Sequence, residues 1–284
     1  MVDTVSPVVR SRRLAAALRR LRLTSGLTIE EVAVQMECST AKLSRIENAL
    51  VTVRVQDARE LLDLYGVHGS EREDLLELVR QAKGRAWWHA YADLMADGFH
   101  RVVGFEAEAS TIRMLEARLI PGLLQTEQYT TALMSLRSDL PPATVDRLVQ
   151  LRMERQRVLR CADPASLLLV LDEAALRRRV GPASLMRDQY RRLIDEARSP
   201  TVGLRVLPLD AEPYQAPGFS FTIFGFADPA DPEVVFEEML EGTGFHEDVD
   251  AVGRYRLAFE HAWSRALDAA ASQDLLAEMA ERLR

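Results

Sequence analysis

The chain has 284 residues, and its 36 Lys and Arg against 43 Asp and Glu give a formal net charge of -7. This length allows about two domains, and a hydrophobic content of 48% is enough for a sizeable core. The acidic balance argues at first sight against a nucleic-acid partner. No apolar run approaches the ~18 residues of a membrane-spanning helix, and the two cysteines provide neither a disulfide framework nor a CxxC metal site. We therefore expect a cytoplasmic protein that crosses no membrane and binds no metal or other cofactor.

The charge is divided unevenly along the chain. Residues 1–60 carry a net charge of +3, whereas residues 61–284 carry -10. A segment whose net charge is opposite in sign to that of the rest of the chain is typical of a separate module. We expect one domain over residues 1–83 and a second over residues 84–284.

Apolar periodicity predicts five short helices in the first module. The first has a leucine stripe on one face and ends before Gly26, and the second begins after Thr28, which forms a capping-box pattern with Glu31. The predicted helices cover residues 8–23, 29–36, 39–48, 55–65 and 71–83. Two helices of about eight residues joined by a short turn, within a bundle of such helices, are the helix-turn-helix layout.

The stretch LRRLRLTSGLTIEEVAVQMECSTAKLSRIENA, residues 18–49, resembles the Cro/phage-repressor (XRE) type of helix-turn-helix. The resemblance covers residues 10–67 and rests on the spacing of the helix, turn and cap residues. It implies that the helix over residues 39–48 enters the major groove of DNA.

The resemblance also implies which residues contact DNA. Arg45 is expected to read a base, because an arginine pairs with guanine through two hydrogen bonds worth ~1–3 kcal/mol, and Thr40 and Ala41 can contact a thymine methyl group. Thr28 is expected to offer its hydroxyl and the free N–H groups of a helix N-terminus to a phosphate. The full set of expected DNA contacts is Thr28, Ser39, Thr40, Ala41, Lys42, Ser44, Arg45, Asn48, Thr52 and Arg54.

Other residues of this region have structural interpretations. The resemblance implies that Arg22 and Glu47 form a buried pair instead of contacting DNA. Lys42 stays open between a phosphate contact and a solvated helix face. The resemblance places Cys38 at a position where the family has a small apolar core residue, which favours a buried, inert thiol over a redox sensor.

Two residues depart from the family pattern. Ile29 stands where relatives often have a DNA-contacting Gln, which bears on one base or phosphate contact. Glu37 stands where a turn glycine is usual, and a non-glycine residue with positive φ costs on the order of 1 kcal/mol. We expect a reshaped turn whose acidic side chain points away from phosphate.

The remaining residues predict an α+β domain, so that the fold class is an all-α helix-turn-helix bundle followed by a helical connector and a small sheet of about four strands. Strands are predicted over residues 166–171, 202–207, 219–226 and 233–240. Helices are predicted over residues 86–94, 105–115, 125–136, 145–160, 181–198, 248–270 and 272–283, and a short helix or a turn over residues 172–178.

The second module contains no nucleotide-binding or catalytic motif and no histidine pair with metal-ligand spacing. Its densest acid cluster favours a solvated strand edge over acid–base chemistry; the cluster is Glu237, Glu238 and Glu241. An enzyme would use this cluster or Asp172 and Glu173, and converging carboxylates with a strongly raised pKa would favour that alternative. Four aromatic residues have two interpretations, packing in the core or lining a ligand pocket or interface. They are Trp87, Trp88, Tyr91 and Phe99.

Five segments of the second module are similar to the C-terminal domain of a large family of actinobacterial XRE-type regulators. They are IPGLLQTEQYTTAL (120–133), LRMERQRVL (151–159), LVLDEAALRRRVG (169–181), LRVLPLD (204–210) and VVFEEML (234–240). That domain has no assigned activity. The resemblance implies a regulator that is often encoded beside a small acidic partner protein, the pair acting in development or antibiotic production.

These observations predict a sequence-specific transcriptional regulator that binds double-stranded DNA and is not an enzyme. One recognition helix buries too little surface for specific affinity, so we expect a homodimer on a pseudo-palindromic site. The acidic second module is expected to lie away from the duplex and to bind a small partner protein or a small-molecule effector. The alternative is an antitoxin-like interaction protein whose main role is binding a small partner through that module.

Overall fold

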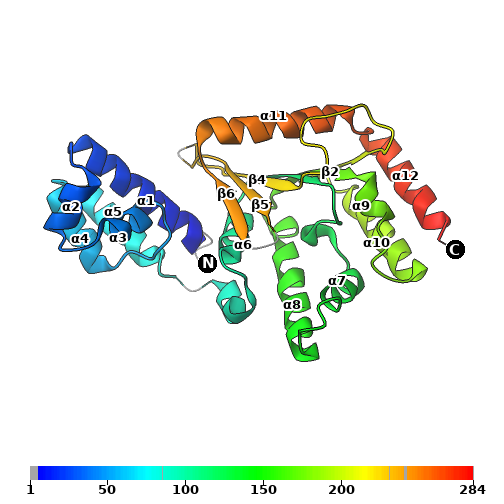
Figure 1. The fold of residues 1–284 in the computed structure, drawn as a ribbon, viewed down its shortest axis with the longest axis horizontal. Helices are drawn as coiled ribbons and strands as arrows, with labels where there is room; N and C mark the ends of the chain where they lie inside the picture. Colours follow the sequence, from blue (N-terminus) through cyan, green and yellow to red (C-terminus); the bar gives the residue numbers. More distant parts are fainter. Residues whose placement is uncertain (1–5, 85, 230, 240–241, 284) are drawn as a thin grey trace. The chain divides into compact units, whose positions relative to one another are not determined.

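The computed structural model describes residues 6–84, 86–229, 231–239 and 242–283. The chain divides into two compact units, Met1–His89 and Ala90–Arg284, which Figure 1 colours from blue to red along the sequence. Among the described residues, the first unit is built from helices, and the second combines helices with a six-stranded sheet.

The first unit contains the five predicted helices. They are α1 (Pro7–Thr24), α2 (Ile29–Gln35), α3 (Thr40–Glu47), α4 (Val55–Leu64) and α5 (Gly69–Gln81). All five contribute to one apolar core, in which Leu18, Val32, Leu43, Leu61 and Leu76 are buried. Because α2, α3 and α4 have 7, 8 and 10 residues and are too short to be stable alone, this shared core is what holds the turns between them in place.

The first four helices end in the same way. In each, the residue after the C-cap has a positive φ, and the next N–H reaches back to the carbonyl of the last helical turn, as in a Schellman motif. Gly26 and Gly66 fill this position after α1 and α4, whereas Glu37 (φ 46°) and Ala49 (φ 53°) fill it after α2 and α3. The strained residues therefore follow α2 and α3. The expectation of a reshaped turn at Glu37 is wrong, because Glu37 adopts the same positive φ and the same turn as the glycines after α1 and α4.

We expect Ala49→Gly to stabilise the first unit by about 0.5–1 kcal/mol, because glycine adopts a positive φ without a Cβ clash. The matched control is Ala41→Gly, the same substitution inside α3, which should destabilise the unit by about 1 kcal/mol. Urea denaturation measures both changes. If the two variants shift the midpoint in the same direction, the strain assigned to Ala49 is wrong.

The second unit is built on a mixed sheet in the order β3-β2-β1-β4-β5-β6. Its strands are β1 (Thr111–Glu116), β2 (Ser166–Asp172), β3 (Val202–Leu207), β4 (Phe221–Gly225), β5 (Val234–Glu238) and β6 (Thr243–His246). The α-helices are α6 (Phe99–Glu106), α7 (Glu127–Met134), α8 (Pro142–Arg155), α9 (Glu173–Arg177), α10 (Ala183–Glu196), α11 (Val249–Arg265) and α12 (Ala269–Glu281). Short 3-10 helices are η1 (Trp87–Leu94), η2 (Gly122–Leu124) and η3 (Gln156–Leu159).

The topology places helices on both faces of this sheet. Strands β1, β2 and β3 are parallel neighbours. The connections from β1 to β2 and from β2 to β3 cross the sheet in the same direction, and right-handed connections of this kind place their helices on the same face of the sheet. These helices, α7, α8 and α10, lie on the opposite side of the sheet from α11 (Figure 1). The remaining strands β4, β5 and β6 extend the sheet as antiparallel neighbours on the other side of β1.

The prediction of a helix over residues 105–115 is wrong, because α6 ends at Glu106 and β1 begins at Thr111. The β1 sequence TIRMLE contains good helix formers, but β1 pairs with β2 on one side and β4 on the other. This central position overrides local propensity. With β1 and the short β6, which was not predicted, the sheet has six strands instead of about four.

A buried polar network holds the loop at residues 120–126. The Gln125 side chain, 2% exposed, donates to the Ile120 carbonyl and accepts hydrogen bonds from Thr130 and Arg152. Gln189, which is fully buried on α10, donates to the Leu124 carbonyl. Buried polar groups that satisfy one another fix a single arrangement of the backbone around them.

A second buried contact is the ion pair of Arg155 and Glu106. Two parallel hydrogen bonds of 2.8 and 2.7 Å join the guanidinium at the end of α8 to the carboxylate at the end of α6. Arg155 also lies over the Phe99 ring. Glu106 raises the pKa of Arg155 against the opposing effect of burial. The pair therefore ties α6 to α8.

Candidate nucleic-acid interface

The helix-turn-helix consists of α2, a turn and α3. Thr28 caps α2, and the Ser39 hydroxyl caps α3 by accepting a hydrogen bond from the Lys42 N–H at 3.1 Å. Leu43 and Ile46 are buried, which turns the opposite face of α3 to solvent. The sequence therefore fixes both where the recognition helix starts and which face it presents.

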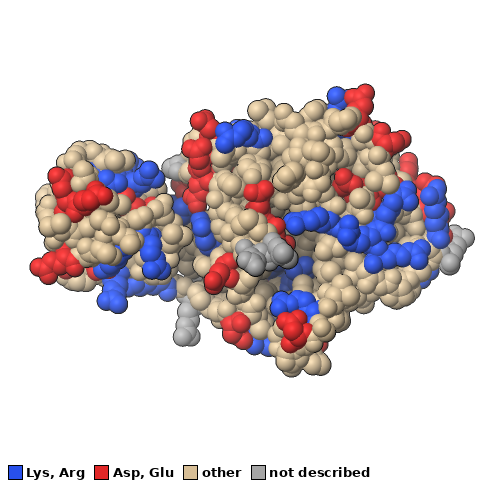
Figure 2. Space-filling view, in the orientation of Figure 1, with Lys and Arg blue, Asp and Glu red and all other residues tan. Residues whose placement is uncertain are grey.

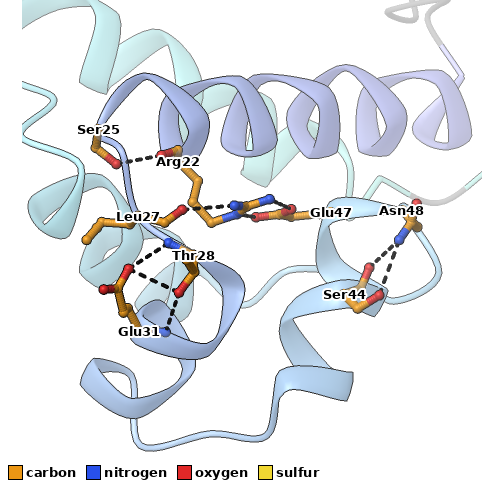
Figure 3. Close-up of polar contacts among 8 residues, drawn as sticks. All are labelled: Arg22, Ser25, Leu27, Thr28, Glu31, Ser44, Glu47 and Asn48. Atoms are coloured by element: carbon orange, nitrogen blue, oxygen red, sulfur yellow. Dashed lines mark hydrogen bonds and ion pairs between the residues drawn. The ribbon is translucent and has the colours of Figure 1, made fainter.

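An ion pair between Arg22 and Glu47 fixes α3 against α1 (Figure 3). The guanidinium donates to both carboxylate oxygens, at 2.7 and 2.9 Å, and to the Leu27 carbonyl at 2.9 Å. The Glu47 side chain is 3% exposed and that of Arg22 is 11% exposed. The hydrogen bonds to Glu47 raise the pKa of Arg22. Both residues are therefore committed to holding the helices together.

The outward face of α3 carries the residues expected to read bases. Thr40, Ala41 and Arg45 are exposed, and within the part of the chain that the structure describes Arg45 has no ion-pair partner. No acidic residue lies in the first turn of α3. This face can therefore approach a polyanion without first breaking an ion pair at Arg45.

Lys42 has a partner within the protein. Its ammonium lies 3.0 Å from Asp57 on α4, and the lysine side chain remains 43% exposed. The pair braces α3 against α4 and reduces the positive charge that Lys42 presents to solvent. A phosphate contact by Lys42 would have to compete with Asp57.

Thr28 is engaged in a complete capping box. Its N–H donates to the Glu31 carboxylate at 2.8 Å, its hydroxyl donates to the same oxygen at 3.0 Å, and the Glu31 N–H donates back at 3.2 Å (Figure 3). The bonds from Thr28 lower the pKa of Glu31. The Thr28 N–H and hydroxyl are therefore already bound to a carboxylate, which a phosphate contact by Thr28 would have to displace.

The other expected contacts lie at the end of α3 and in the loop after it. The Asn48 amide donates to the Ser44 carbonyl at 2.7 Å; Asn48 is exposed and Ser44 is half-buried. Thr52 and Arg54 are exposed on either side of the buried Val53. Val53 thus anchors this loop, and its neighbours point outward.

Charge is segregated in both units. On the face drawn in Figure 2, basic and acidic side chains of the first unit gather on different sides. The second unit is acidic in sum but not uniformly so, because basic side chains gather around α9 and α10 (Figure 2), where Arg177, Arg178 and Arg179 are exposed.

The carboxylates considered for catalysis in the second unit make structural contacts. Glu237 accepts hydrogen bonds from Tyr255 at 2.7 Å and contacts His246 at 2.8 Å. Asp172 caps α9, and Glu173 binds Arg177 and the Leu209 N–H. Glu238 is exposed, and Glu241 lies outside the described residues.

The aromatic group and Cys38 have mixed surroundings. Trp88 is buried, whereas Trp87 is 40% exposed and packs edge-on against it. Phe99 lies under the Arg155 guanidinium. Cys38 is half-buried in the turn before α3, not fully buried as expected. The described residues contain no group of three or more His, Cys, Asp or Glu arranged to hold a metal ion.

A cavity at the carboxyl end of β1 was not predicted from the sequence. It contains Glu116, Arg118 and Ser220, and the first two lie at or just beyond the strand that was predicted as a helix. A charged residue at the carboxyl end of a strand is the signal that a correct strand prediction would have supplied.

Two family models match the chain. Residues 13–75 match a helix-turn-helix domain, which covers α2, the turn and α3. Residues 99–278 match a domain of unknown function (DUF5753), which is more than half of the chain. The chain belongs to the DUF5753 family.

The helix-turn-helix match confirms the prediction of that motif and indicates that this DUF5753 protein binds DNA. No curated protein and no solved structure matches the chain significantly. In the described part of the DUF5753 protein, no helix is both long and apolar enough to cross a membrane.

Proposed function

We propose that this DUF5753 protein is a sequence-specific transcriptional regulator of the XRE type that acts as a cytoplasmic homodimer. The observation that carries the proposal is the exposed face of α3, with Arg45 unpaired among the described residues and the helix fixed from behind by Arg22 and Glu47. A dimer follows from the small surface of one recognition helix, since two copies can bind half-sites one helical turn apart.

The test of this proposal is selection of duplex DNA from a random pool by the full chain, with and without a cell lysate. We expect a pseudo-palindrome whose half-sites are about 10 base pairs apart. A change of the selected site in lysate supports an effector or partner of the second unit. A pool without an enriched sequence would contradict sequence-specific binding.

Arg45→Ala should weaken binding to the selected site by about 1–3 kcal/mol per half-site and relax the preference at one base, because it removes a bidentate pair with guanine. The matched control is Arg80→Ala on α5, an exposed arginine whose partner Glu77 is on the same helix. Fluorescence anisotropy on the selected site and its single-base variants measures both. Unchanged binding by Arg45→Ala would mean that α3 is wrongly assigned.

For the second unit we propose a binding role, with a small ligand or a small partner protein, and no enzymatic activity. One observation favours an enzyme instead: burial raises the pKa of Glu116 to about 7 in a cavity that also contains Glu238. The lining hydroxyl that contacts Glu116 is that of Ser220, whose oxygen already accepts the Ala117 N–H at 3.0 Å. We therefore interpret this carboxylate as a binding group.

The antitoxin-like alternative makes partner binding by the second unit the main role of the chain. Purification at native expression tests it, because a stoichiometric small protein should then accompany the chain even when its DNA site is absent. Recovery of the chain alone, together with an enriched DNA site, favours the regulator.

A further inference from the structure

A cavity of about 190 Å³ opens where the sheet of the second unit changes direction. Strand β1 has a parallel neighbour, β2, on one side and an antiparallel neighbour, β4, on the other. The chain runs from β1 to β2 and β3, and then returns to the far side of β1 to form β4, β5 and β6. In open sheets, such a switch at the carboxyl ends of parallel strands is where ligands bind.

The wall of the cavity combines charged, hydroxyl and aromatic groups. It is lined by Glu116, Arg118, Leu119, Ser220, Phe221, Thr222, Phe236 and Glu238. Side chains alternate along a strand, so Glu116 on β1 and Phe236 and Glu238 on β5 face the same side of the sheet as Thr222, which pairs with Phe236. Two carboxylates therefore border an aromatic ring that is half-buried.

The single cation of the described lining does not cancel the two carboxylates. Arg118 is exposed, and its guanidinium donates to the backbone carbonyl of Glu238 at 3.1 Å. Ser220 donates to the Glu116 carboxylate, while its oxygen accepts from the Ala117 N–H. Outside the lining, Arg152 and Arg155 also interact with Glu238. A ligand with one positive charge would give Glu116 a counter-charge and could lie against the Phe236 face, as cations do over aromatic rings.

The volume limits the size of the ligand. Sites for drug-sized molecules measure about 300–1,000 Å³, and one water occupies about 30 Å³ of liquid. A cavity of 190 Å³ excludes nucleotides and leaves room for a small ring or short chain with one amino group.

We infer that this cavity binds a small organic amine, with its ammonium between Glu116 and Glu238 and its apolar part against Phe236. This assignment names a ligand class for the effector role proposed above, and it is tested without DNA. A failed DNA selection would therefore not contradict amine binding, and a failed amine titration would not contradict the proposal for the helix-turn-helix.

Binding of an amine should depend on pH through Glu116. Burial and Glu238 raise the pKa of Glu116 to about 7, against the lowering effects of Ser220 and Arg118. The ammonium needs the ionised carboxylate, so affinity should fall up to about tenfold per pH unit below 7 and should fall again at high pH, where the amine itself loses its proton. Binding at pH 7 should release about half a proton, because Glu116 is then half protonated and the bound cation lowers the pKa of its carboxyl.

The experiment is isothermal titration calorimetry of the full chain with three probes that share one ring: benzylamine, benzyl alcohol and benzoate. At pH 8, benzylamine should bind at least about tenfold more tightly than benzyl alcohol, the ratio expected from one charge-assisted hydrogen bond. Titration at pH 7 in two buffers of different ionisation enthalpy measures the proton released.

The matched variants are Glu116→Gln in the cavity and Glu281→Gln on the exposed surface of α12. Glu116→Gln should lose the preference for benzylamine and the proton release, whereas Glu281→Gln should retain both. Since the amide resembles the protonated carboxyl, Glu116→Gln should raise the thermal midpoint more at pH 8 than at pH 5, which also shows that it folds.

Three results would overturn the inference. The first is tighter binding of benzoate than of benzylamine, which would assign the cavity to an anion held by Arg118. The second is unchanged benzylamine binding in Glu116→Gln. The third is no binding of any probe to the wild-type chain up to about 10 mM, since a small amine that fills a formed site should reach at least that affinity.

Discussion

Glu47→Gln should lower the free energy of unfolding of the first unit by about 3–5 kcal/mol, because it leaves the Arg22 guanidinium buried without its counter-charge. The carboxylate accepts two of the three hydrogen bonds that Arg22 makes, and both side chains are almost inaccessible to water. A unit of this size has a total stability of about 4–12 kcal/mol. In the variant, a larger fraction of molecules should therefore have an unfolded first unit. DNA binding should weaken, although none of the residues expected to contact DNA is changed.

Hydrogen exchange of the full chain, followed on peptides from α1 to α4, measures this effect separately from the second unit. Glu73→Gln, an exposed carboxylate on α5, is the control and should leave exchange unchanged. The double variant Arg22→Met with Glu47→Leu should lose less stability than Glu47→Gln, since it leaves no buried charge unpaired. Protection in Glu47→Gln equal to that of the wild type would contradict the structural role of the pair.

Gln125→Leu should destabilise the second unit by about 3–5 kcal/mol, because one substitution leaves several buried groups without partners. The lost contacts are to the Ile120 carbonyl, the fully buried Thr130 hydroxyl and the Arg152 guanidinium. Burial already lowers the pKa of Arg152 to about 10. The Gln125 side-chain oxygen is the one hydrogen-bond acceptor that the described residues provide for the Arg152 guanidinium, and the substitution removes it.

The control for this prediction is Gln128→Leu, three residues further along and exposed on α7. Urea denaturation followed by tryptophan fluorescence reports the second unit through Trp263 on α11 when all variants carry Trp87→Phe and Trp88→Phe, since these two tryptophans belong to the first unit. The Gln128 variant should stay within about 0.5 kcal/mol of the wild type. Equal midpoints for both leucine variants would mean that the loop at residues 120–126 does not depend on Gln125.

The first unit could be predicted from the sequence because its signals are local. Helix boundaries follow from caps such as Thr28 and Ser39 and from stops such as Gly26, and each acts within a few residues. The pairing of Lys42 with Asp57 was not predictable in this way, since it depends on how α3 crosses α4. That contact changes what Lys42 can offer a phosphate.

The second unit was less predictable because its decisive contacts are distant in sequence. The strand character of residues 111–116 comes from neighbours more than fifty positions away on β2 and β4, and the error hid the cavity beside Glu116. The loop residue Gly122 illustrates the same limit, because a Cβ there would lie 3.3 Å from the Arg152 guanidinium. The block around Gly122 was recognisable from the sequence, but the contact that favours glycine at this position comes from Arg152 on α8.

The capping box at Thr28 has a consequence for how the protein searches DNA. A helix N-terminus filled by its own carboxylate displaces fewer condensed counterions from the duplex, so the sequence-independent share of the binding free energy falls. We expect shorter residence on random DNA, with no effect on the base readout proposed for α3. The chain should spend less time sliding and should discriminate its site more sharply than a relative whose second helix clamps the backbone.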